Sequence, residues 1–324
     1  MTQKRHGEPL PLGSADLPYS KGVMARALIA AGVPADRAYG LAVRVELDLA
    51  ESGERTVDLE RLRSLAHETL GGDEGERAVG RLRRLADLQR LDVPIVVLIG
   101  GSTGTGKSTV AAEVGHRLGI TRVASTDFIR QTMRAFFSRE FMPTIHYSSF
   151  EAGQAVDGDV TGDPTIVGFV DQCRHVCVGV EAAMERALTE GWSMVLEGVH
   201  LVPGLVRADL PGALIAHVIV GIEDEDVHRI HFHVRDMTTG GIRAMDKYLE
   251  HLDDIRRIQT YIVGRARREG VRVVENANVE RTIDEVIEIV MQSAEALRQP
   301  DSRSGAGKAG ASAPVEPPSS LRLT

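Results

Sequence analysis

The sequence predicts an α/β fold in which helices cover both faces of a parallel sheet. Short segments are predicted as strands at 95–99, 122–124, 193–197, 214–220 and 272–274. Helical patterns separate these segments, and such alternation is typical of βαβ units, whose strands run parallel between two layers of helices. The first strand runs directly into a glycine-rich turn and a helix-forming stretch. Ligands of such sheets collect at the carboxyl ends of the strands, where this turn lies.

The glycine-rich turn has the spacing of a phosphate-binding loop, G-x-x-x-x-G-K-S, starting at Gly101. Its glycines allow the backbone to wrap a phosphate, Lys107 neutralises the phosphate charge, and Ser108 can ligate magnesium. The helix predicted over 109–118 directs its positive N-terminal end at the same anion. We therefore predict a P-loop NTPase fold rather than an ordinary glycine-rich turn. The predicted nucleotide-binding residues of the loop are Gly101, Ser102, Thr103, Gly104, Thr105, Gly106, Lys107, Ser108 and Thr109.

The composition restricts the class of protein. Of the 324 residues, 43% are hydrophobic and 26% are charged, as in ordinary globular chains. The longest apolar runs are much shorter than the roughly 20 residues that cross a bilayer, and the polar N-terminus shows no secretory signal, so we expect a cytoplasmic protein with no membrane partner. The net charge of -8 argues against a nucleic-acid partner. The sequence leaves the oligomeric state open and is compatible with a homo-oligomer.

The chain divides into four predicted segments. These are a flexible N-terminus at 1–17, a small helical domain at 18–91, the domain of the phosphate-binding loop at 92–298, and a disordered tail at 299–324. The helical domain is predicted from leucines that repeat at three- and four-residue steps. Its boundary falls near Pro94, because proline disfavours helix in the preceding residue. The tail is rich in Ser, Gly, Ala and Pro and has too few large apolar residues to order itself.

Cysteines and histidines occur at close spacing in two places. Cys173 and Cys177 are four residues apart, but without a second pair of thiols we predict that they are buried and reduced rather than bound to zinc. His228, His231 and His233 lack a carboxylate or cysteine at metal-site spacing, so we predict no metal there.

An acidic residue follows the second predicted strand and is predicted to face the phosphate-binding loop. Asp127 lies at the same edge of the sheet as the loop, where the hydroxyl that accepts a phosphate must lie. Its carboxylate could take the proton of that hydroxyl or help to hold magnesium. The alternative is structural: Asp127 could cap a helix that begins at Phe128. Arg130 and Arg134 share a face of this helix, as two guanidinium groups would if they held one phosphorylated substrate, and surface solvation is the alternative for them.

A second acidic residue ends the third predicted strand. The apolar run Met194-Val195-Leu196 precedes Glu197 and delivers its carboxylate to the active edge of the sheet. This placement suits a magnesium ligand, although a hydrogen bond to strand-end backbone would also explain it.

Arginines surround a polar, glycine-containing stretch at 238–241 that has the character of a closing lid. Arg229, Arg235 and Arg243 bracket this stretch. Arginines that close over a transferring phosphoryl group stabilise its spread negative charge and exclude water. We predict that Arg229 contacts the nucleotide and that Arg235 acts on the transferring group.

Several strings of residues give the chain a family resemblance. Beside the phosphate-binding loop, these are Ser125-Thr126-Asp127, Pro143-Thr144-Ile145-His146-Tyr147-Ser148-Ser149, Glu197-Gly198-Val199-His200-Leu201-Val202-Pro203-Gly204 and Arg256-Arg257-Ile258-Gln259-Thr260-Tyr261. With them the chain resembles the 2-phosphoglycerate kinases from about residue 18 to about residue 290. Many families share the loop, whereas the second and third strings are far more distinctive.

The resemblance implies a P-loop kinase with a parallel sheet and a lid, preceded by a small helical ATP-cone-like domain that opens at Pro18. It implies transfer of the ATP γ-phosphate to 2-phosphoglycerate, which yields 2,3-bisphosphoglycerate. Lys107 and the loop amides would hold the β- and γ-phosphates, and Ser108 with Glu197 would position Mg²⁺. Asp127 would orient or deprotonate the acceptor hydroxyl. The residues that would bind the phosphate and carboxylate of the substrate are Arg130, Arg134 and His146.

Two other functions remain open from the sequence. A kinase of the same fold could act on another small phosphorylated acid or on a nucleoside- or RNA-linked hydroxyl. A non-catalytic ATP-binding switch is the other alternative, but such a switch has no need of the acceptor site formed by Asp127, Arg130 and Arg134.

Overall fold

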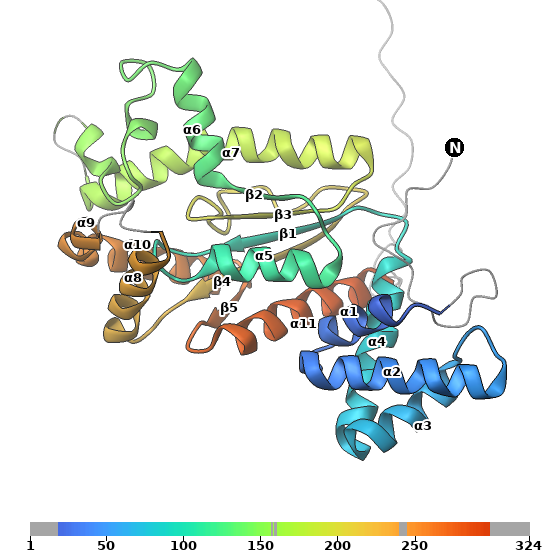
Figure 1. The fold of residues 1–324 in the computed structure, drawn as a ribbon. Coiled ribbons are helices and arrows are strands. Elements are labelled where there is room, and N and C mark those ends of the chain that lie inside the picture. Colours follow the sequence, from blue (N-terminus) through green and yellow to red (C-terminus); the bar gives the residue numbers. More distant parts are fainter. Residues whose placement is uncertain (1–18, 157, 159–160, 240–244, 299–324) are drawn as a thin grey trace, which may run out of the picture.

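The computed structural model describes residues 19–156, 158, 161–239 and 245–298, so the predicted flexible N-terminus and disordered tail lie outside the described residues. Within these ranges, a parallel sheet of five strands in the order β2-β3-β1-β4-β5 lies between helices on both faces (Figure 1). This is the predicted α/β architecture. The strands are β1 (Ile95–Gly100), β2 (Val123–Ser125), β3 (Met194–Gly198), β4 (Leu214–Gly221) and β5 (Arg272–Glu275). Each coincides with a predicted strand to within one or two residues.

Helices pack on both faces of the sheet through alternate residues of its strands. Val97 and Ile99 of β1 pack with α5 and α11, whereas Val96 and Leu98 pack with α7 on the opposite face. Full burial of a parallel strand on both sides explains its continuous apolar sequence. The helices of this part are α5 (Lys107–Leu118), α6 (Thr126–Phe136), α7 (Pro164–Glu190), α8 (Glu225–Thr239), α9 (Met245–Glu250), α10 (Leu252–Arg268) and α11 (Val279–Arg298), with short 3-10 turns at Pro143–His146 and Ala152–Ala155.

The N-terminal helices lie at the far end of the molecule from α6, α8 and α9 (Figure 1). They are α1 (Lys21–Ala30), α2 (Ala35–Ser52), α3 (Leu59–Leu70) and α4 (Gly72–Gln89), and they enclose a hydrophobic core of their own. Leu85 and Leu88 of α4 instead join the core beneath the sheet, and Arg84 donates hydrogen bonds to Glu288 of α11 at 2.8 and 3.0 Å. The segment predicted to be helical from its leucine spacing therefore forms the helices α1 to α4. That this domain is an ATP cone stays a prediction.

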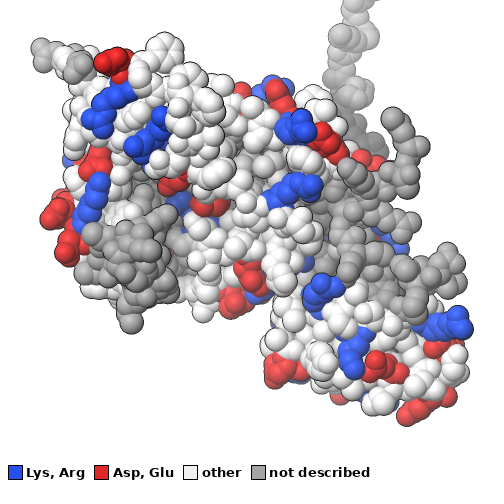
Figure 2. All heavy atoms as spheres, turned by 45° about the horizontal axis from the view of Figure 1, so that its top comes forward, with Lys and Arg blue, Asp and Glu red and all other residues white. Residues whose placement is uncertain are grey.

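Two further expectations concern packing and surface. Cys173 and Cys177 are buried on α7 as free thiols in the core, as predicted. None of the described helices is long and apolar enough to cross a membrane. On the face shown in Figure 2, Lys and Arg side chains are interspersed with Asp and Glu side chains.

Candidate active site

The phosphate-binding loop connects β1 to the N-terminus of α5, as its spacing predicts. Gly104 and Gly106 have φ of 87° and 80°, a left-handed conformation that favours glycine, and they turn the backbone around the centre of the loop. The Nζ atom of Lys107 donates to the Ser102 carbonyl at 3.2 Å, and the Thr105 hydroxyl donates to the same carbonyl at 3.1 Å. The lysine is thereby held across the concave side of the loop.

Register within the sheet brings Glu197 to the start of α5. Glu197 pairs with Ile99 of β1 on one side and with Ser125 of β2 on the other, and it is only 8% exposed. The hydroxyl of Ser108 donates to its Oε1 atom at 2.9 Å. A hydroxyl and a carboxylate at this separation suit Mg²⁺, which binds hard oxygen ligands and completes its shell with phosphates and waters. In the described part of the chain, no group of three or more His, Cys, Asp or Glu side chains is placed to hold a metal.

Asp127 is not the cap of α6, so the structural alternative for this residue is wrong. The helix begins at Thr126, and its cap is Ser125, whose hydroxyl accepts a hydrogen bond from the Phe128 amide at 3.0 Å. Asp127 therefore lies in the first helical turn, with 60% of its side chain exposed at the edge of the site. The helix thus begins two residues earlier than that alternative placed it, because serine caps a helix about as well as aspartate does.

The carboxylate of Asp127 is held in its ionised form. Partial desolvation by the surrounding protein acts to raise the pKa of Asp127, but His200 in its protonated form, Arg130 and Lys107 together keep that pKa below its usual value. The Nε atom of Arg130 lies 3.3 Å from Oδ1 of Asp127. An ionised carboxylate that faces Lys107 can accept a hydrogen bond from a hydroxyl placed between the two groups.

The two arginines of α6 differ in their surroundings, although they share a helix face. Arg130 is 8% exposed, and its Nη1 atom donates to the carbonyls of Ile145 and Tyr147 at 2.9 and 2.8 Å. Surface solvation is therefore wrong for Arg130, which ties α6 to the segment 143–147. Arg134 is exposed and donates to Gln131 at 3.0 Å. Arg134 is open to a ligand, whereas Arg130 has committed Nη1 to backbone carbonyls and Nε to Asp127. That the two arginines hold one phosphorylated substrate stays a prediction.

His146 lies on a 3-10 turn, between the two residues whose carbonyls accept from Arg130. Its Nε2 atom is 3.0 Å from the Phe137 carbonyl. Because a carbonyl can only accept, Nε2 carries a proton and the other ring nitrogen, Nδ1, remains for a further contact.

A buried hydrogen-bond network joins the two distinctive strings. Nδ1 of His200 lies 2.7 Å from the Thr126 hydroxyl, and its Nε2 atom lies 3.0 Å from Oε1 of Gln172. The amide nitrogen of Gln172 donates to the carbonyls of Thr144 and Tyr147. Because the nitrogen of Gln172 is used in this way, its oxygen must accept from Nε2–H of His200, and the Thr126 hydroxyl then donates to Nδ1. This network fixes the start of α6 relative to the segment that carries His146.

The predicted lid arginines lie on or beyond α8. Arg229 is exposed and forms an ion pair with Glu225 at 2.6 Å. Arg235 lies within α8, but its side chain is outside what the structure describes, and Arg243 falls outside the described residues altogether. Thr238 and Thr239 belong to the end of α8, so this part of the predicted polar stretch is helical, and Gly240 and Gly241 lie outside the described residues.

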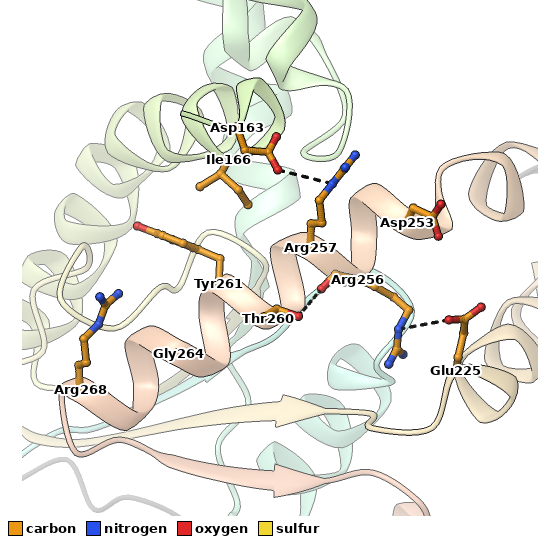
Figure 3. A pocket seen from close by; sticks show the side chains of 10 residues that line it. All are labelled: Asp163, Ile166, Glu225, Asp253, Arg256, Arg257, Thr260, Tyr261, Gly264 and Arg268. Atoms are coloured by element: carbon orange, nitrogen blue, oxygen red, sulfur yellow. Dashed lines mark hydrogen bonds and ion pairs between the residues drawn. The ribbon is translucent and has the colours of Figure 1, made fainter. Parts of the chain in front are cut away.

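The last string, Arg256 to Tyr261, lies on α10. Its side chains face either the protein interior or the surface. Gln259 is buried, donates to the Ile222 carbonyl at 2.6 Å and accepts from the Ser102 hydroxyl at 3.4 Å, which braces the phosphate-binding loop against the end of β4. The outer face of α10 lines a surface groove of about 790 Å³, in which Figure 3 shows Tyr261 and Arg268.

Curated relatives decide the family. The chain is 36% identical over 280 residues to a 2-phosphoglycerate kinase of Pyrococcus furiosus, covering 86% of this chain and 91% of the relative. It is 37% identical to the Thermococcus kodakarensis enzyme of that name over 87% of this chain and 95% of the relative. It is 40% identical to the Methanothermobacter thermautotrophicus enzyme of that name over 83% and 89%. The chain belongs to the 2-phosphoglycerate kinase family.

Two other comparisons add little to the family assignment. No protein-family model matches the chain. Among solved structures, shikimate kinase from Acinetobacter baumannii in complex with shikimate aligns over 62% of this chain and 94% of its own, with 15% identity and a TM-score of 0.37, a value too low to support an argument. The resemblance stated from the sequence strings is thus confirmed by overall sequence similarity.

Several residues that support the site could not be recognised from the sequence. Gln172 lies in a helix between apolar residues, where no motif marks it, and the quoted string gave no role to His200. His228 and His231 contact the phosphate-binding loop and were considered only as metal ligands. The sequence signal for His228 and His231 is their three-residue spacing, which places both side chains on one face of a helix.

We expect the free energy of unfolding to fall below pH 6.5 because two buried histidines are neutral in the folded protein. Burial lowers the pKa of His200 and of His228 from 6.5 to about 4. The unfolded chain therefore binds these protons first, and each histidine should cost about 2 kcal/mol of stability at pH 5 relative to pH 7.5. Urea unfolding at both pH values measures the loss, which His200→Gln should reduce by about 2 kcal/mol. An unchanged loss in that variant would show that His200 is already charged in the native state.

Proposed function

We propose that this protein is an ATP-dependent kinase that transfers the γ-phosphate of ATP to the free hydroxyl of 2-phosphoglycerate, with Mg²⁺ as its cofactor and 2,3-bisphosphoglycerate as its product. The observation that carries the proposal is similarity over most of both chains to enzymes named 2-phosphoglycerate kinase. The geometry agrees, since a phosphate-binding loop, a hydroxyl–carboxylate pair and a second ionised carboxylate meet at one edge of the sheet.

The phosphate-binding loop provides the nucleotide half of the mechanism. Backbone N–H groups and Lys107 hold the β- and γ-phosphates, and Arg229 and Arg235 of α8 are assigned to the nucleotide and the transferring group. Ser108 and Glu197 would hold Mg²⁺, which would neutralise the negative charge of the phosphates. Most of the catalytic effect of such a site comes from positioning and electrostatic stabilisation.

The first turn of α6 provides the acceptor half. Asp127 accepts a hydrogen bond from the acceptor hydroxyl and so aims its oxygen at the γ-phosphorus. Because the pKa of Asp127 is lower than usual, the carboxylate orients the hydroxyl first and takes its proton late. The new P–O bond forms as the bond between the γ-phosphorus and the β,γ-bridging oxygen breaks, and ADP leaves with that oxygen. Arg134, the remaining donors of Arg130, and His146 hold the phosphate and carboxylate of the substrate. The positive charges of Arg130 and Arg134 explain how a chain of net charge -8 can attract a small polyanion at one place.

A competition among three acids tests the proposed substrate. With ATP and Mg²⁺ the protein should consume 2-phosphoglycerate in strong preference to glycerate, because glycerate lacks the phosphate that the arginines would hold. Loss of two charge-assisted hydrogen bonds corresponds to about 10² to 10⁴ in kcat/KM. Preference over 3-phosphoglycerate should follow from in-line geometry, since that isomer carries the same charges and presents a different hydroxyl.

Phosphorus NMR of the mixture identifies the products. A product with phosphates on adjacent carbons, formed from 2-phosphoglycerate alone, supports the proposal. Equal use of both phosphoglycerates would refute the assigned specificity, and consumption of glycerate alone would also refute the arginine site. Nucleotide binding without turnover of any of the three acids would favour another acceptor or a switch.

A further inference from the structure

Three side chains from outside the phosphate-binding loop contact three successive carbonyls of its backbone. Nε2 of His228 lies 2.8 Å from the Thr103 carbonyl. Nδ1 of His231 lies 3.2 Å from the Gly104 carbonyl. The third contact, from the Asn276 amide to the Thr105 carbonyl, measures 2.9 Å. The histidines come from α8 and Asn276 follows β5, so the loop is held from two separate elements.

The chemistry of these contacts assigns the protons. A carbonyl only accepts, so His228 must carry its proton on Nε2 and His231 must carry one on Nδ1. The orientation of the Asn276 amide is also determined, because its Oδ1 atom accepts from the Thr282 hydroxyl at 3.0 Å. His228 is fully buried, and its other nitrogen, Nδ1, has no hydrogen-bond partner among the described residues. The fold therefore tolerates one unsatisfied polar atom, Nδ1, on this buried histidine.

Contact between the loop and these side chains is close. A Cβ atom on Gly104 would lie 2.9 Å from Nε2 of His228 and 2.5 Å from the ring of Phe232. A Cβ atom on Gly106 would lie 2.4 Å from the amide nitrogen of Asn276. Phe232 stacks on His228 with ring centroids 5.2 Å apart, which fixes the imidazole ring in its plane. Only glycine at these two positions lets the supporting side chains reach the backbone.

Fixing a carbonyl also fixes the amide of the same peptide unit. The unit is planar and trans, so its N–H bond points away from its C=O bond. Holding the carbonyls of Thr103, Gly104 and Thr105 on the outside of the loop directs the next N–H group of each unit to the inside. Inward N–H groups in succession form the concave site that binds phosphate.

We propose that His228, His231 and Asn276 are positioning residues of the nucleotide site, which keep the loop amides aimed at the phosphates before ATP arrives. This inference rests on the proposed function only in that the loop binds ATP. Preorganised donors do not have to be reordered when the anion binds, so loss of a support should weaken nucleotide affinity. The acceptor site should be affected far less.

Paired substitutions test the role of the proton on each ring. The amide nitrogen of glutamine can replace Nε2 of histidine, and that of asparagine can replace Nδ1. In the full chain, H228N and H231Q should raise the Kd of a fluorescent N-methylanthraniloyl-ATP by about 5- to 150-fold, as expected when a buried partner is left unsatisfied. H228Q and H231N should recover most of that loss. The exposed His233 of the same helix provides the control, and H233Q should bind the probe like the wild type.

Thermal melting without nucleotide and steady-state kinetics accompany the binding data. The KM for ATP should follow the Kd pattern, while the KM for 2-phosphoglycerate changes by less than about threefold. Equal Kd values within each pair, or lower Tm with unchanged Kd, would overturn the inference and leave only a packing role. If H228N does not fold, the half-buried His231 pair decides the outcome. The Kd pattern without turnover of 2-phosphoglycerate would support this inference and refute the proposed function.

Discussion

Lys107→Ala is expected to lower kcat/KM for ATP by about 10² to 10³ without unfolding the protein. Such a loss is typical when one preorganised donor is removed from a developing negative charge. In the structure the Nζ atom of Lys107 has one hydrogen bond to the protein, to the Ser102 carbonyl at 3.2 Å. Its removal therefore costs the folded state little, whereas the nucleotide loses a positive charge at the β- and γ-phosphates.

Turnover, nucleotide binding and a melting curve of the same preparation measure this effect. The Thr105 hydroxyl continues to donate to the Ser102 carbonyl at 3.1 Å, so the loop should keep its shape in the variant and the Tm should change by only a few degrees. Wild-type turnover by a folded Lys107→Ala protein would refute the assignment of the loop as the ATP site of a kinase.

The parts of the site that could be predicted from the sequence are those that depend on strand order. In a parallel sheet all carboxyl ends lie at one edge, so the loop after β1, Asp127 after β2 and Glu197 at the end of β3 had to meet there. The structure brings Ser108 and Glu197 within 2.9 Å, and the register of β1 with β3 accounts for that contact. The prediction required only that each segment be recognised as a strand.

Other parts could not be predicted because they depend on packing between elements distant in the chain. Arg130 is buried because the segment around Ile145 folds back over α6, and its sequence neighbours give no sign of this. The contact of His200 with Gln172 needs β3 and α7 to be placed side by side. Likewise, the support of the loop by His228 depends on where α8 crosses it. Side-chain partners of this kind follow from the tertiary fold rather than from periodicity.

Asp127→Asn should lower kcat by about 10² to 10⁴ while the Kd for ATP changes by less than about threefold. Asparagine has nearly the same shape and can still accept a hydrogen bond, but it has no negative charge and cannot take a proton. The variant therefore keeps the packing of the first turn of α6 and loses the orientation and deprotonation of the acceptor hydroxyl. Stopped-flow or steady-state turnover, together with nucleotide titration, separates these two effects.

The cap of α6 supplies the matched control for this prediction. Ser125→Ala removes the hydroxyl that accepts from the Phe128 amide at 3.0 Å, so it should lower the free energy of unfolding by about 1 kcal/mol. Asp127→Asn should cause a smaller loss, because Asp127 does not cap the helix and its exposed carboxylate contributes only the pair with Arg130 at 3.3 Å. If instead Asp127→Asn destabilised the protein and turned over normally, the carboxylate would be structural and the acceptor hydroxyl would have to be oriented by another group. The two variants, two residues apart at the start of α6, thus distinguish the chemical role of Asp127 from a structural one.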